Sequence, residues 1–184
     1  MNSLADNALM LKVKSGETDK LGLLYERHKG KLFGFFYNLN GNSELSEDLV
    51  QNVFIRMMKY KHTYSGEGSF MAWMFTTARN VNHDYFKKHK NELKENELSS
   101  YEYRIKNDED MERDITRKEQ MNQLKTAMNK LDAEKREVLV LSKLKEMKFN
   151  QIGEVLGCSE GAAKVKAHRA LKELRTIFME LEMR

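Results

Sequence analysis

The sequence predicts an all-α protein made of two small helical domains. The 184 residues include no proline, and 33% of them are charged. Apolar residues recur three and four positions apart on both sides of residues 91–114, as the buried face of a helix requires. Residues 91–114 themselves hold nine acidic residues and few apolar ones, which favours a linker. We therefore expect a domain over 1–90, an acidic linker over 91–118 and a second domain over 119–184.

The first domain is expected to contain four helices. Each begins or ends at a residue that favours a helix terminus: glycine or Asn-Gly at the ends, and serine as the N-cap of the last two. A polar loop with two glycines separates the third helix from the fourth. The expected helices are Leu4–Val13 ending near Gly16, Lys20–Asn40, a helix capped by Ser46 that runs to about Tyr60, and, after the loop Lys61–Gly68, a helix capped by Ser69 that runs to about Lys90.

Polar residues line one side of the third helix. They lie off the apolar stripe that contains Val50, Val53, Phe54 and Met57, so they are expected to face away from the core. Such a face is suited to binding a partner helix. Its members are Asp48, Gln51, Asn52 and Arg56.

Basic and amide side chains gather toward the end of the fourth helix, which follows a loop containing Tyr64. Basic residues interleaved with aromatic ones suit phosphates and unstacked bases. The residues in question are Tyr64, Arg79, Asn80, Lys87 and Lys88. Two simpler interpretations stay open. The lysines would also complement the negative end of a helix, and Trp73 lies in the apolar stripe, which favours a place in the core.

The second domain ends in a pattern typical of a helix-turn-helix. Helices are expected over Ile115–Met128 and Leu131–Leu141, the latter with Asp132 as N-cap. A short helix with Ile152, Val155 and Leu156 on one face follows. It ends at Gly157, because glycine adopts the left-handed cap conformation at the lowest steric cost. Ser159 then caps a second helix that begins at Glu160. Most side chains on its inner face are small, which permits close approach of the first helix. This face contains Ala163, Ala167, Ala170 and Leu174.

The outer face of this last helix is basic with one apolar side chain. A helix about 10–12 Å across fits the major groove of DNA, where Lys and Arg reach phosphates or guanine and Val can touch a thymine methyl. The alternative is a solvated basic face on an ordinary helical hairpin. The candidate DNA-binding residues are Glu160, Lys164, Val165, His168, Arg169 and Lys172.

Other classes of site have little support. No spacing among the five histidines and Cys158 resembles a metal site, so we assign no metal, cofactor or catalytic residue. His28 falls within an apolar stripe and is interpreted as a satisfied core residue. No apolar run approaches the roughly 18 residues of a membrane span, so a soluble cytoplasmic protein is expected. The net charge is only +4, so nucleic-acid binding is suggested by where the basic residues lie.

The order of these parts resembles that of a bacterial RNA polymerase sigma factor of the extracytoplasmic-function (ECF) type, which has only region 2 and region 4. The resemblance covers most of the chain outside the linker. It departs where Leu131-Asp132 stands in place of the family's frequent Leu-Pro, and where Met71 stands in place of an arginine. The matching blocks are Ser46–Phe54, Ser69–Asn80, Leu131–Leu141 and the helix-turn-helix.

The resemblance implies a role for each candidate face. The set Asp48, Gln51, Asn52 and Arg56 would face the coiled-coil clamp helices of the largest subunit of core RNA polymerase. The loop and the fourth helix would receive the minus-ten promoter element and capture an unstacked base, and the last helix would read the minus-thirty-five element. An anti-sigma partner is also implied. Two rival interpretations remain: a helix-turn-helix regulator that acts without being a polymerase subunit, and a helical adaptor that binds no nucleic acid.

Overall fold

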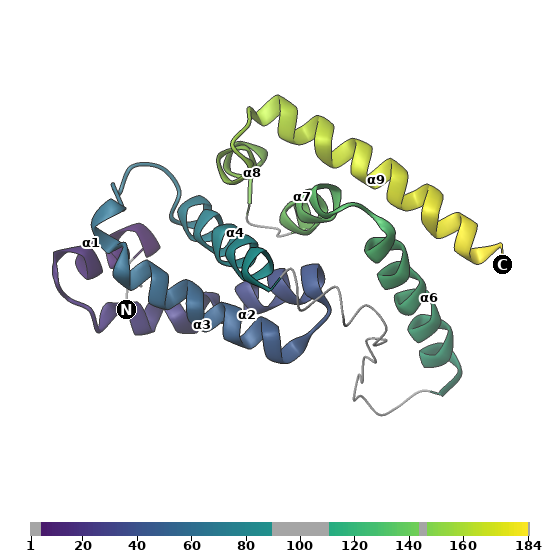
Figure 1. Ribbon diagram of the computed structural model, residues 1–184, viewed down its shortest axis with the longest axis horizontal. Coiled ribbons are helices and arrows are strands. Elements are labelled where there is room, and N and C mark those ends of the chain that lie inside the picture. Colours follow the sequence, from purple (N-terminus) through teal and green to yellow (C-terminus); the bar gives the residue numbers. More distant parts are fainter. Residues whose placement is uncertain (1–4, 90–110, 144–146, 184) are drawn as a thin grey trace.

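The computed structural model describes residues 5–89, 111–143 and 147–183. Their regular structure is helical. No strand occurs among these residues, so the predicted all-α fold is confirmed. Figure 1 shows the order of the elements along the chain. They are α1 (Asp6–Ser15), α2 (Lys20–Asn40), α3 (Ser43–Lys59), the 3₁₀ turn η1 (Lys61–Thr63), α4 (Phe70–Lys88), α6 (Met111–Lys130), α7 (Ala133–Lys143), α8 (Phe149–Leu156) and α9 (Glu160–Glu182).

Most helix ends lie where the local sequence places them. Ser69 accepts a hydrogen bond from the Ala72 amide at 3.4 Å, and Ser159 accepts one from the Ala162 amide at 3.2 Å. Asp132 caps α7 in the same way through the Lys135 amide, at 2.8 Å. These side chains satisfy amides that have no partner inside the helix, which fixes where each helix begins.

Two helix starts differ from the prediction. Helix α3 begins at Ser43 because Asn42, in extended conformation, accepts a hydrogen bond from the Leu45 amide at 3.0 Å. Ser46, predicted as the cap, is buried one turn later and donates its hydroxyl to the Asn42 carbonyl. Helix α6 begins at Met111, inside the range assigned to the linker. The remainder of that linker, with Lys90, lies outside the described residues.

The first bundle packs α2, α3 and α4 around an aromatic centre, with α1 along one side. The rings of Phe35 and Phe75 meet edge to face, with centroids 5.3 Å apart. Trp73 contacts Tyr64 in the same manner at 5.0 Å, which confirms its place beside the core. His28 is only 3% exposed, and its Nε2 lies 2.8 Å from the Asp6 carboxylate on α1. The place of His28 in the core is thus confirmed.

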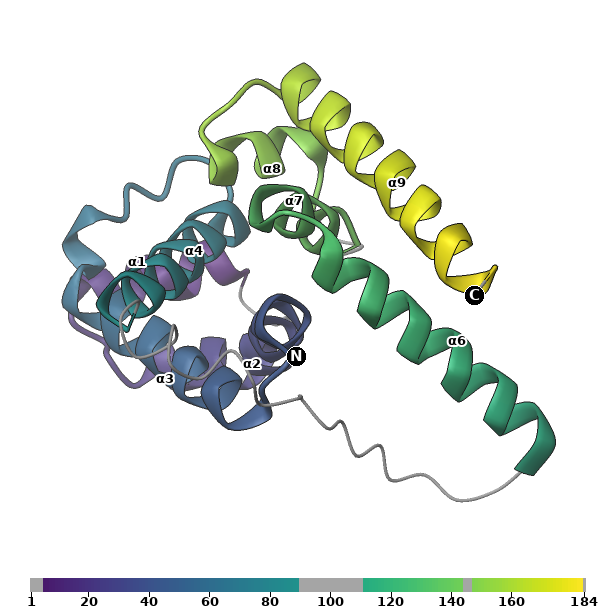
Figure 2. The ribbon, with the colours of Figure 1, turned by 45° about the vertical axis from the view of Figure 1, so that its right-hand side comes forward.

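The second bundle packs α7 against α8 and α9, and α6 lies along the C-terminal half of α9 (Figure 2). Val138, Leu139 and Leu141 on α7 are buried together with Ile152 and Val155 on α8. Leu144, which the apolar spacing of this segment adds to the same seam, lies outside the described residues. The alanines on the inner face of α9 are buried, so α8 approaches closely. At Gly153 the approach is so close that an added Cβ would lie 2.6 Å from the Cys158 carbonyl oxygen.

The two bundles pack against each other. Helix α8 contacts α4, and α7 contacts α2. Arg136 on α7 donates a hydrogen bond to the Leu39 carbonyl at 3.1 Å, and Gln151 on α8 donates one to the Ser69 hydroxyl at 2.7 Å. Burial out of water lowers the pKa of the Arg136 guanidinium. The buried apolar residues of both bundles form one contiguous cluster, so in this conformation the modules are in intimate contact.

The close approach at Gly153 predicts an unusual sign for a Gly→Ala substitution. Alanine in an open helix interior is favoured over glycine by about 1 kcal/mol. At Gly153 the methyl group would overlap a backbone carbonyl, which has to move. We expect Gly153→Ala to destabilise the protein by about 2 kcal/mol, measured by chemical unfolding.

The matched control is Gly22→Ala on α2, where an added Cβ would meet no atom within 4 Å. This substitution should leave stability unchanged or raise it by up to about 1 kcal/mol. Equal stability of the two variants would contradict the close packing of α8 against the turn.

Candidate nucleic-acid and polymerase interfaces

The N-terminal half of α9 presents the predicted outer face to solvent. All six candidate residues from Glu160 to Lys172 are exposed, and Val165 is 49% exposed despite being apolar. Lys164 pairs with Glu160 at 2.6 Å, but both side chains are at least half exposed. A pair so open to water is worth little, and another anion can replace Glu160. The face is therefore accessible and cationic, as the sequence predicts.

Helix α9 is held firmly behind this face. Ala163 and Ala170 are fully buried, and Gly157 adopts the left-handed conformation (φ +67°) that ends α8. Lys135 on α7 lies 2.8 Å from Asp132 and 2.8 Å from Glu173, linking the start of α7 to α9. Hydrogen bonds to Asp132 and then Glu173 raise the pKa of Lys135. The outer face is thus mounted on a fixed scaffold, as side-chain readout of a groove requires.

The candidates on α4 do not form one cluster. Asn80, Lys87 and Lys88 are exposed, but Lys88 lies about 14 Å along the helix from Arg79. The Arg79 Nε donates to both carboxylate oxygens of Glu137 on α7, at 3.0 Å each. The Glu137 side chain is only 8% exposed. In this conformation Arg79 therefore binds the second bundle.

The structure corrects the interpretation of Tyr64 as a DNA-contacting residue. Tyr64 is only 2% exposed, and its hydroxyl donates to Asn7 on α1 at 2.7 Å. Burial raises its pKa to about 12, so the phenol stays protonated at neutral pH. The ring packs between Phe70 and Trp73 instead of facing a base. Because Tyr64 lies in a polar loop, nothing in the local sequence indicated that its side chain would be buried.

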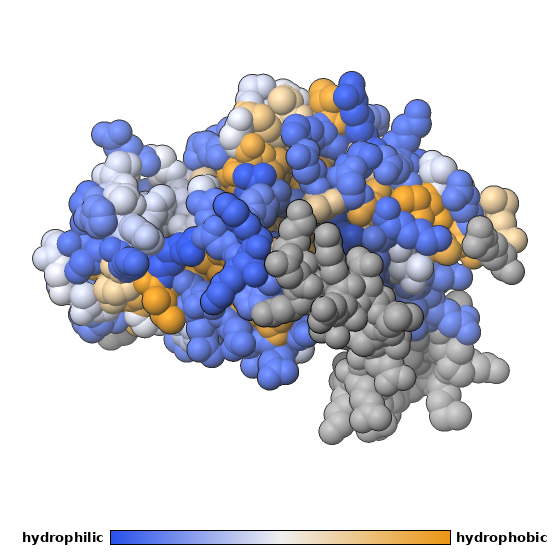
Figure 3. Space-filling model, viewed as in Figure 1, coloured by the Kyte–Doolittle hydropathy of each residue, from blue (hydrophilic) through white to orange (hydrophobic). Residues whose placement is uncertain are grey.

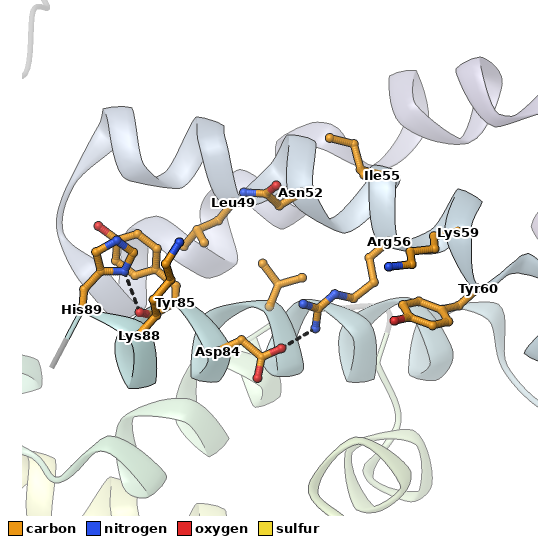
Figure 4. A pocket seen from close by; sticks show the side chains of 11 residues that line it. Leu49, Asn52, Ile55, Arg56, Lys59, Tyr60, Asp84, Tyr85, Lys88 and His89 are labelled. Atoms are coloured by element: carbon orange, nitrogen blue, oxygen red, sulfur yellow. Dashed lines mark hydrogen bonds and ion pairs between the residues drawn. The ribbon is translucent and has the colours of Figure 1, made fainter.

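A groove of about 540 Å³ runs between α3 and α4 (Figure 4). Two of the predicted polymerase-binding residues, Asn52 and Arg56, line it, whereas Asp48 and Gln51 are exposed on α3 but do not line it. Arg56 crosses to α4 and pairs with Asp84 at 2.7 Å. Asp84 lines the groove as well, and apolar and basic side chains make up the remaining wall: Leu49, Ile55, Lys59, Tyr60, Val81, Tyr85, Lys88 and His89.

Among the wall residues that the sequence analysis did not predict, Ile55 is the most exposed apolar one. Its side chain is 64% exposed, and Tyr60 beside the same groove is 43% exposed. The face in Figure 3 is mostly hydrophilic, with hydrophobic residues gathered in several patches. Large apolar side chains held open to water beside polar ones are typical of a protein-binding surface. Ile55 was overlooked in the sequence because it lies next to Arg56, beside the polar face of α3.

Among the described helices, none is long and apolar enough to span a bilayer.

Family models match both bundles. The model for sigma-70 region 2 matches residues 24–92, and that for sigma-70 region 4 matches residues 121–174. The first match contains α3, α4 and the loop between them, and the second contains the helix-turn-helix. Helix α1 precedes both.

Similar proteins match most of the chain. The chain is 30% identical over 176 residues to the RNA polymerase sigma factor CarQ of Myxococcus xanthus, covering 95% of this chain and 98% of that protein. It is 26% identical over 157 residues to the ECF RNA polymerase sigma factor SigX of Bacillus subtilis, covering 83% and 80%. The sigma factor RpoE of Bartonella quintana, solved with the anti-sigma factor NepR, superposes with a TM-score of 0.66 at 20% identity, covering 86% and 96%.

The relatives are named as RNA polymerase sigma factors, and in this chain the region 2 match contains α3 and α4 while the region 4 match contains α8 and the first part of α9. With an exposed cationic helix face, a groove within region 2 and both family regions in place, the chain belongs to the sigma-70 family as an RNA polymerase sigma factor of the ECF type.

Proposed function

We propose that this sigma factor binds core RNA polymerase through the α3–α4 groove and directs it to promoters whose minus-thirty-five element is read by α9 and whose minus-ten element is opened on α4. The observation that carries the proposal is the outer face of α9. Six residues of suitable chemistry are exposed on one face of a capped helix whose other face is locked into a core. The family supplies the context of polymerase and promoter.

At the minus-thirty-five element, α9 would enter the major groove with its N-terminal turns. Lys164, Arg169 and Lys172 have the length to reach phosphates or guanine edges, and exposed Val165 suits a thymine methyl. Glu160 at the helix start would accept from a cytosine amino group once Lys164 turns to a phosphate. Sequence readout and phosphate binding would then come from adjacent turns of the same helix.

At the minus-ten element, the exposed Asn80, Lys87 and Lys88 would follow the backbone of the nontemplate strand along α4. Arg79 would join them only after leaving Glu137, because both interactions use the same guanidinium. The exchange would accompany separation of the two bundles. Binding of an unstacked base by the loop Lys61–Gly68, together with phosphate contacts along α4, would offset the few kcal/mol that unstacking costs. Binding energy, and no covalent chemistry, would drive opening.

The α3–α4 groove would receive the clamp helices of the polymerase. Its apolar wall contributes burial, and Arg56, Lys59 and Lys88 at its rim favour an acidic partner surface. Asp48 and Gln51, exposed on the same helix, would lie at the edge of the contact. An anti-sigma protein is proposed as a second partner, since a sigma factor of the same fold has been solved with one. A cytoplasmic location is proposed as well, because the proposed partners, polymerase and promoter DNA, are found there.

The central test is reconstitution. Purified protein added to core polymerase should co-elute with it and yield transcripts from a subset of genomic promoters, mapped by their start sites. Promoter binding by the free protein should be weak, because two modest DNA contacts gain effective concentration only when joined on polymerase. Tight, specific promoter binding without any association with polymerase would favour the helix-turn-helix regulator instead.

Lys164→Ala should weaken holoenzyme binding to the minus-thirty-five element by about tenfold at moderate salt and lower the slope of log K against log salt by about one. The loss comes from one phosphate contact, so it should be similar across promoter sequences. Lys166→Ala is the matched control. Lys166 is equally exposed on α9 but pairs with Glu134 on α7, away from the outer face. Equal effects of both substitutions would show that only net charge matters.

Ile55→Glu should lower affinity for core polymerase by at least about tenfold, measured by titration of labelled polymerase, because a hot-spot apolar contact becomes a buried carboxylate. Stability should change little, since the side chain is mostly exposed. Leu23→Glu, on α2 and 49% exposed, is the control and should bind polymerase normally. Unchanged polymerase affinity of the Ile55 variant would remove the groove from the interface.

A further inference from the structure

The side chain of Asn7 in the first turn of α1 binds both ends of the loop between η1 and α4. Its Oδ1 accepts the Tyr64 hydroxyl at 2.7 Å and the Phe70 amide at 3.0 Å. Its Nδ2 donates to the Gly68 carbonyl at 3.0 Å. The Asn7 side chain thus joins the two ends of residues 64–70, although Asn7 is about sixty residues away in sequence.

The three partners require an amide at this position. The Phe70 N–H and the protonated Tyr64 phenol are donors, and the Gly68 carbonyl is an acceptor. Only a side chain with an acceptor and a donor on the same planar group serves all three. An aspartate would keep the two accepted bonds but set a negative charge against the Gly68 oxygen. Alanine would leave the Tyr64 hydroxyl in the core with no partner, which is costly.

Two further contacts extend the hold of α1 along this loop. Leu11 lies so close under Gly66 that a Cβ there would be 2.8 Å from its Cδ2, and Gly66 has a φ of +80°. Lys14 donates its ammonium to the Tyr64 carbonyl. The loop itself turns on Ser65, whose hydroxyl accepts the Glu67 amide at 3.1 Å. Ser65, Glu67 and Gly68 are nevertheless exposed, so α1 fixes the shape of a solvent-facing segment.

We propose that Asn7 is a positioning residue for promoter opening: from α1, outside the matched region 2, it holds the loop 64–70 in the shape that receives the unstacked base of the minus-ten element. The inference rests on the proposed function of this loop. Because the loop is already ordered, it loses little conformational entropy when the base binds. More of the binding free energy is then available to hold the base outside the duplex. Tyr64 contributes as part of this support and does not touch the base.

The test uses holoenzyme made with the full chain and fluorescent single-stranded oligonucleotides that carry a mapped minus-ten element of the nontemplate strand. An abasic site is moved through the element one position at a time. Wild-type holoenzyme should lose affinity sharply at one position, where the captured base is missing. With Asn7→Asp and Asn7→Ala, affinity for the intact strand should fall about tenfold, as expected when one or more such hydrogen bonds are lost, and the abasic penalty should largely disappear.

Three variants separate positioning from general stability. Asn122→Asp, an exposed site on α6, makes the same charge change and should behave as wild type. Tyr64→Phe deletes only the hydroxyl and should reduce the abasic penalty partially. Gly66→Ala should reduce it strongly, because strain at positive φ and contact with Leu11 displace the loop while Asn7 is retained. Affinity for core polymerase and for the minus-thirty-five element should be unchanged in every variant.

Wild-type affinity and a full abasic penalty in Asn7→Asp and Gly66→Ala would overturn the assignment of Asn7. Loss of polymerase binding in parallel with strand binding would overturn it as well, by showing a structural role alone. If wild-type holoenzyme showed no abasic-sensitive position at all, the proposed capture of a base by this loop would fail first. Because Asn7→Asp keeps two of the three hydrogen bonds, it should fold even where Asn7→Ala does not.

Discussion

Helix α4 has to satisfy both bundles, and this constraint organises the structure. Its apolar side, with Phe75 and Ala78, fills the core of the first bundle, while α8 packs against it from the second. Arg79 leaves α4 toward α7 and meets Glu137, which is almost fully buried. A buried carboxylate of this kind is costly without a cation, so the pair stabilises one relative placement of the bundles. The same guanidinium is proposed to bind DNA, so the two uses of α4 exclude each other.

What could be predicted from the sequence is what depends on near neighbours. The apolar stripe of α2 and the caps Ser69, Asp132 and Ser159 act within a few residues, so spacing reveals them. The outer face of α9 was accessible to the same reasoning because its inner face is a regular row of alanines. The start of α3 was misplaced because Asn42 and Ser46 are both good caps, and which of them caps the helix depended on which one the core buried.

The remaining features depend on contacts between distant residues. Nothing near Tyr64 indicates that Asn7 will bind its hydroxyl, and nothing near Arg79 indicates Glu137. The exposure of Ile55 follows from how α3 lies against α4, which a helical pattern leaves undetermined because the residue sits beside the polar face. The candidate site on α9 was therefore predicted more fully than the one on α4, where tertiary contacts change what each side chain is free to do.

Helix α9 has one further consequence, which follows from its length. Its 23 residues form one continuous helix, with the exposed cationic face at the N-terminal end and Ile177 and Phe178 against the rest of the bundle near the other end. The helix spans about 34 Å and acts as a rigid lever. A tilt of about 10° about residue 177, with α7 and α8 carried along, would move Glu160 by about 4 Å, close to the rise of one base pair. Small adjustments at the α6 seam therefore translate into the register in which a promoter is read.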